Sequence, residues 1–177
     1  MRKLLENVRS GLISFSRCKS SKPLSLEYFD KCEELAYNSI KTFDRVFLIN
    51  LKKGPDSVHF FKLSEKSFGR RTNMYFGAQS DTDNFLECLK GAPEAKDEQV
   101  FASTQSETFP ERSITMQRVL NHYILIVEED LSSDKARKIH LDIELVPKIA
   151  RIFQLQLNLL RSSPQGGNQS NKGQRRK

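Results

Sequence analysis

The chain has 177 residues, enough for one domain or for two small halves that share a core. Lys and Arg outnumber Asp and Glu by 29 to 22, and the net charge of +7 favours nucleic acid or another polyanion as the partner. Three cysteines without short spacing indicate a reduced intracellular protein, and the lack of any apolar run of ~18–20 residues excludes a membrane span.

Residues 1–24 are interpreted as a basic N-terminal arm. Apolar residues recur at helical spacing before Gly11, and Pro23 ends the segment. The Arg and Ser content also fits a mitochondrial presequence, although Glu6 counts against one. Two interpretations stay open: an arm of a cytoplasmic or nuclear protein, and a mitochondrial targeting segment.

The next segment predicts a helix over residues 25–40 that packs on the sheet following it. Ser25 fits the N-cap position. The apolar residues then recur at helical spacing, at Leu26, Phe29, Leu35, Ala36 and Ile40.

Residues 43–91 predict three strands and one helix. The strands are rich in β-branched and aromatic residues and occupy 46–52, 58–63 and 73–77. Turn residues at 54–56 and 67–71 separate them. Residues 80–83 can cap a helix over 81–90, and Gly91 and Pro93 end it. The predicted first unit, residues 25–91, is an N-terminal helix followed by β-β-β-α.

A polar connector over residues 92–98 leads into a second unit that ends at residue 161. Its predicted strands occupy 99–106, 113–120, 122–128 and 137–144, with a turn at 131–134. Pro147 fits the first position of a helix over 148–161. The sequence thus predicts an α+β fold of two antiparallel sheet-plus-helix units, β-β-β-α and β-β-β-β-α, around one core. Residues 162–177 have no apolar side chain and predict a disordered basic tail.

No catalytic signature is present. His59, His122 and His140 lie far apart in the sequence, and none has a Cys or carboxylate at metal-ligand spacing. P-loop, G-x-S-x-G and H-x-E motifs are also missing. We therefore expect a protein that is not an enzyme and that holds no cofactor or metal.

The order of elements resembles the PUR repeat and, more distantly, the Whirly proteins, whose units are a four-stranded antiparallel sheet followed by a helix. The residues that carry the resemblance are 45–53, 60–65, 74–76 and 83–89. At the second strand Val58-His59 stands where the PUR pattern has Gly-Arg. The resemblance implies single-stranded nucleic-acid binding on the outer face of the sheet.

Such binding needs cations for phosphates and aromatic rings on which bases stack. Phe60 and Lys62 lie two apart and share a face, while Phe61 and Leu63 point to the helix. The candidates in the first unit are Lys52, Phe60, Lys62, Lys66, Arg70, Arg71 and Tyr75, and those in the second are Arg118, Tyr123 and Lys138. A second interpretation makes Phe60 and Tyr75 core residues and the cations ordinary solvated positions. Arg70 and Arg71 follow Gly69 in a tight turn and can grip a phosphate from two sides.

A competing resemblance covers residues 74–90, which look like the last strand and closing helix of a pleckstrin-homology-like domain, although that helix usually carries a Trp and this chain has none. It implies a protein-interaction or adaptor module within a larger complex. The favoured hypothesis remains a single-stranded nucleic-acid-binding protein, with RNA favoured over DNA. Protein partners and a homodimer or larger homo-oligomer are also expected.

Overall fold

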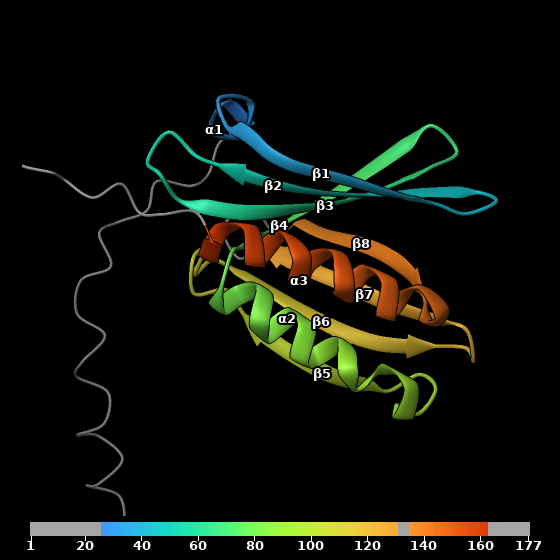
Figure 1. Ribbon diagram of the computed structural model, residues 1–177. Coiled ribbons are helices and arrows are strands. Elements are labelled where there is room, and N and C mark those ends of the chain that lie inside the picture. Colours follow the sequence, from blue (N-terminus) through green and yellow to red (C-terminus); the bar gives the residue numbers. More distant parts are fainter. Residues whose placement is uncertain (1–25, 131–134, 163–177) are drawn as a thin grey trace, which may run out of the picture.

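The structure, a computed structural model, describes residues 26–130 and 135–162. The predicted arm over 1–24, the turn at 131–134 and the tail beyond Ser162 lie outside the described residues. Within the described ranges, strands form two four-stranded antiparallel sheets, each followed by a helix, which confirms the α+β class (Figure 1).

The first sheet has the strand order β1-β2-β3-β4 and the second has the order β5-β6-β7-β8. A short helix, α1 (Leu26–Asp30), precedes the first sheet, which consists of β1 (Glu33–Lys41), β2 (Arg45–Lys53), β3 (His59–Ser67) and β4 (Arg70–Gly77). Helix α2 (Ser80–Lys90) and the 3-10 turn η1 (Ala92–Glu94) connect it to β5 (Val100–Gln105), β6 (Arg112–Val119), β7 (Tyr123–Asp130) and β8 (Lys135–Asp142). The chain then forms the 3-10 turn η2 (Ile143–Leu145) and helix α3 (Val146–Ser162).

The prediction of a helix over residues 25–40 is wrong for most of that segment. Only Leu26–Asp30 is helical, and Glu33–Lys41 forms the edge strand β1. Strand β1 pairs with β2 over nearly its whole length. That pairing satisfies backbone groups of β2 that a helix would leave without partners. The first unit is therefore β-β-β-β-α, the same order as the second, rather than β-β-β-α.

Both units contribute to one hydrophobic core between the sheets and helices. Phe61 of β3 and Phe85 of α2 each contact Phe153 of α3, with ring centroids 4.9 and 5.5 Å apart. Helix α2 packs against β4, β5 and α3, and α3 also contacts β2. Each helix thus contacts the sheet of the other unit, so neither unit closes its core alone.

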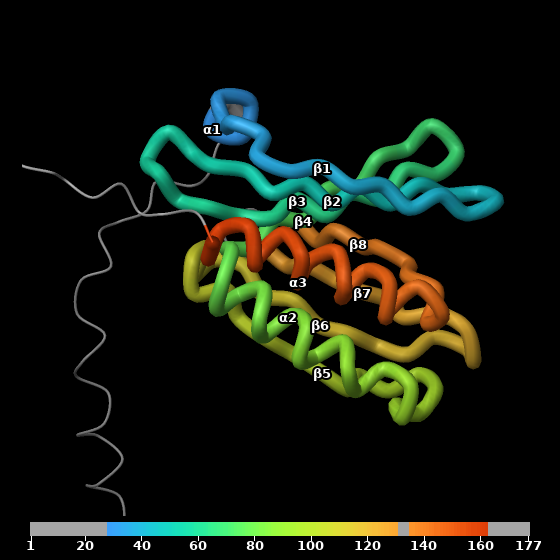
Figure 2. The backbone as a smooth tube through the Cα atoms, viewed as in Figure 1, coloured from blue at the N-terminus to red at the C-terminus, as the bar shows by residue number. Residues whose placement is uncertain are grey.

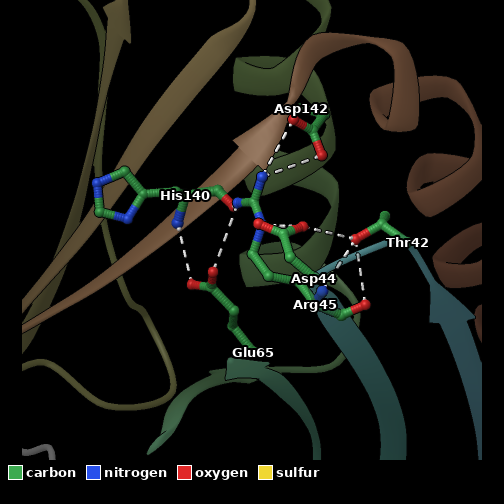
Figure 3. Close-up of polar contacts among 6 residues, drawn as sticks. All are labelled: Thr42, Asp44, Arg45, Glu65, His140 and Asp142. Atoms are coloured by element: carbon green, nitrogen blue, oxygen red, sulfur yellow. Dashed lines mark hydrogen bonds and ion pairs between the residues drawn. The ribbon is translucent and has the colours of Figure 1, made fainter. Parts of the chain in front are cut away.

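The two sheets meet where edge strand β4 runs beside edge strand β8. The carboxylate of Glu65 in β3 accepts a hydrogen bond of 3.1 Å from the backbone N–H of His140 in β8. Arg45 of β2 donates to the His140 carbonyl at 2.6 Å and lies 3.5 Å from Glu65 (Figure 3). Arg45 also donates to both carboxylate oxygens of Asp142 at 3.2 Å. The buried Arg45–Glu65 ion pair of the first sheet therefore hydrogen-bonds to both backbone groups of His140 in the edge strand of the second sheet.

The same arrangement recurs in the opposite direction. Glu128 of β7 accepts a 2.9 Å hydrogen bond from the backbone N–H of Tyr75 in β4, and it lies 3.5 Å from Arg112. The positions correspond: Glu65 pairs with the residue two after Arg45, and Glu128 pairs with the residue two after Arg112. Burial raises the pKa of the Glu128 carboxyl even though Arg112 and Arg137 lower it. Each sheet thus supplies one buried carboxylate that accepts a backbone N–H from the edge strand of the other sheet.

We expect Glu128→Ala to lower the free energy of unfolding by about 3–5 kcal/mol, because it leaves the Arg112 charge buried and the Tyr75 N–H without its acceptor. Urea unfolding followed by circular dichroism measures the change. Glu129→Ala is the matched control: that side chain is exposed, and a change within ~0.5 kcal/mol is expected. If Glu128→Ala lowers the free energy of unfolding no more than the control does, the hydrogen bond and ion pair of Glu128 do not stabilise the fold.

Candidate nucleic-acid interface

The outer face of the first sheet carries cations in register. In an antiparallel pair, residues directly opposite each other share a face. Lys62 of β3 lies opposite Tyr75 of β4, and Lys66 lies opposite Arg71. Phe61 and Leu63, on either side of Lys62, belong to the core cluster on the other face, as predicted. Helix α3 lies on that inner side in Figure 1, so the cations point away from the packed helices.

Lys52 joins the same face from β2, since it pairs with Phe60. A hollow of about 270 Å³ brings its side chain together with Lys62, and Phe29, Asp30, Asn73 and Tyr75 also line it. Lys41, at the end of β1, lies on this face as well and was not predicted. We call the surface formed by Lys52, Lys62, Lys66 and Arg71 the cationic face.

The cations of this face affect one another. Burial lowers the pKa of Lys62, and the positive charges of Arg71 and Lys52 lower it further, while Glu34 and Asp30 oppose the shift. The Lys62 ammonium also lies 6.0 Å from the centroid of the Tyr75 ring. The pKa of Lys62 is thus lowered overall, mainly by burial and to a smaller extent by the neighbouring positive charges.

The aromatic rings predicted to stack bases are not open. Phe60 is fully buried and Tyr75 is 7% exposed, because α1 folds over this end of the sheet. Phe29 of α1 stacks on Tyr75 with ring centroids 3.8 Å apart and planes 17° apart. Together with Phe109 these residues form a second, smaller hydrophobic cluster. Phe60 and Tyr75 are therefore buried residues of a hydrophobic cluster, which agrees with the alternative interpretation.

A groove between β4 and β8 continues the cationic face toward the second sheet. A hollow of about 450 Å³ is lined by Arg71 of β4 and by Arg137 and Lys138 of β8. An adjacent hollow of about 530 Å³ is lined by Arg70 and again by Lys138. Arg71 and Lys138 thus line one hollow and Arg70 and Lys138 line the other, and strand register puts Arg70 on the opposite face of β4 from Arg71. Sequence reasoning missed Arg137, although its position beside Lys138 on a predicted strand was a usable signal.

Arg118 and Tyr123 do not join this surface. The Arg118 guanidinium donates to the carbonyls of Ala92, Pro93 and Ala95 at 3.3, 2.8 and 2.9 Å, so it clamps the turn η1. The Tyr123 ring lies 5.4 Å from the guanidinium of Arg45, within the contact between the sheets. Both side chains have structural partners, and their predicted role in binding has no support from their positions.

Neither the scan of the chain against models of known protein families nor the search for similar curated proteins gives a match. Among the described residues, no three His, Cys, Asp or Glu side chains gather in a way that would hold a metal ion. No helix within residues 26–130 and 135–162 combines the length and apolar character needed to span a membrane.

The mutual influence of the cations is testable by titration. We expect the ammonium of Lys62 to titrate below its ordinary pKa of 10.5. Arg71→Ala should raise that pKa, because it removes a neighbouring positive charge. NMR spectroscopy of the lysine side chains over a pH series measures both. Lys90→Ala, on the exposed side of α2, is the control and should leave the Lys62 titration unchanged; a response to both substitutions would contradict a local effect.

Proposed function

We propose that this chain binds single-stranded nucleic acid, RNA or DNA, on the cationic face and in the adjoining β4–β8 groove. One observation carries the proposal: strand register gathers Lys52, Lys62, Lys66 and Arg71 on the sheet face that lies away from α2 and α3 and that α1 covers at one end only. Lys62 and Lys66 lie four residues apart on β3, about 13 Å, with Lys52 near the first and Arg71 opposite the second, so the face presents positive charge at two separated places. A phosphate backbone is the natural ligand for such a face.

The neutral polar groups of the face support a single strand as the ligand. Asn73 and Ser64 lie between the cations, and the Ser64 hydroxyl donates to the Asn73 side chain at 2.7 Å. The amide nitrogen of Asn73 can therefore still donate to a base edge, which a single strand exposes and a duplex keeps paired. Arg70 and Lys138 supply further cations beside the face, while Arg137 already pairs with Glu128 at 2.8 Å.

A protein partner is the second candidate, and a different surface favours it. A hollow of about 710 Å³ lies between α2 and α3 and is lined largely by apolar groups, among them Leu86, Leu89, Val146 and Ala150. An adaptor module, or a homo-oligomer, would use this groove rather than the cationic face. The two candidates therefore predict sensitivity to substitutions on opposite sides of the first sheet.

The test uses the full chain with a triple substitution of Lys62, Lys66 and Arg71 to Ala. Because each lost phosphate contact reduces the salt slope by about 0.7 for a single strand, the slope should fall by about 2. Fluorescence anisotropy with labelled single-stranded RNA, single-stranded DNA and the matching duplex, over a salt series, measures affinity and slope.

The matched control removes the same charge elsewhere, by Lys90, Lys96 and Lys148 to Ala, all exposed positions away from the cationic face. Its binding should equal that of the unsubstituted chain. Equal losses in the two triple variants would show that net charge alone matters, and binding without salt dependence would count against a phosphate interface.

A further inference from the structure

Phe68 occupies a position that folding does not explain. It lies in the β3–β4 turn between Ser67 and Arg70, and its side chain is 88% exposed. Its φ of 47° lies in the left-handed region, which a bulky side chain adopts only with strain, and Gly69 follows with a φ of 76°. Two-residue turns with two positive φ angles favour Asn-Gly. A Phe here gains almost no burial, and such strain accumulates at functional sites.

The surroundings of the ring are chemically suited to a nucleotide. Phe68 lines the hollow of about 530 Å³ together with Arg70 and Lys138. The one carboxylate in the lining, Glu65, is already paired with Arg45 and with the His140 N–H. The Phe68 ring and two cations therefore line a single space together with His140, and its volume is within the ~300–1,000 Å³ typical of small-molecule sites.

The hairpin also lies where a strand leaving the cationic face would arrive. Lys66 and Arg71 form the last outward-facing pair before the turn, so Phe68 follows them directly. Figure 2 shows the β3–β4 hairpin at the end of the sheet away from α1. Phe29 covers Tyr75 at the opposite end, beside α1. The exposed ring thus stands at the open end of the face.

We propose that Phe68 is a base-stacking residue: a base of the bound strand lies on its ring while Arg70 and Lys138 contact the flanking phosphates. This inference rests on the proposed function and assigns the stacking role to a residue outside the predicted set. Base–aromatic stacking tolerates any base, so the site contributes affinity without sequence selection.

The experiment compares a base-bearing single-stranded oligonucleotide with an abasic deoxyribose-phosphate strand of the same length. Phe68→Ala in the full chain should weaken binding of the oligonucleotide by about tenfold, the effect of one stacked base, and leave binding of the abasic strand unchanged. Leu120→Ala is the matched control, because Leu120 is also exposed, at 62%, with a positive φ of 57° in a hairpin turn. It should alter neither affinity.

A second variant reports stacking directly. The chain contains no tryptophan, so Phe68→Trp introduces a single fluorophore. Its emission should be quenched by the oligonucleotide and not by the abasic strand. Equal losses for both ligands in Phe68→Ala, or no loss, together with unquenched emission, would overturn the stacking role while the proposed function stands. If the unsubstituted chain binds neither strand, the proposed function fails as well.

Discussion

The rest of the structure depends on one pair of reciprocal hydrogen bonds, in which a carboxylate of each sheet accepts a backbone N–H from the edge strand of the other. Edge strands present unpaired backbone groups that favour association with other chains. Here Glu65 accepts the N–H of His140 from β8, and Glu128 accepts the N–H of Tyr75 from β4. Each carboxylate has its own buried arginine, so the charges are balanced as well as hydrogen-bonded. The two edges therefore hold each other at a fixed separation.

The groove of the candidate interface is a product of this pairing. Arg70 and Arg71 come from β4, and Arg137 and Lys138 come from β8. Each of the two hollows is lined from both edges, so neither sheet alone would form it. The aromatic core of Phe61, Phe85 and Phe153 also requires both units, because its rings come from both of them. Stability and the candidate interface thus both depend on the presence of the two units.

The sequence predicted the parts of the fold whose pattern is local. Alternation located seven of the strands, and helical spacing located α2 and α3. Strand β1 was missed because its pairing with β2 overrides the helix-like spacing of apolar residues up to Ile40. The role of Glu65 and Glu128 left no signal, since a charged residue within a strand is ordinarily assigned to the solvent face. Phe60 and Tyr75 were correctly placed on the outer face, but only the folded position of α1 shows that they are covered.

The stack of Phe29 on Tyr75 also determines where the N-terminal segment joins the body. Helix α1 lies on the outer side of the first sheet, whereas α3 lies on the inner side (Figure 1). At the α1 end of this outer side, Phe29, Phe60 and Tyr75 are buried against one another. The β3–β4 hairpin, with its exposed Phe68, lies at the other end (Figure 2). The outer face of the first sheet therefore has a closed apolar end and an open end, which gives it a direction along the strands.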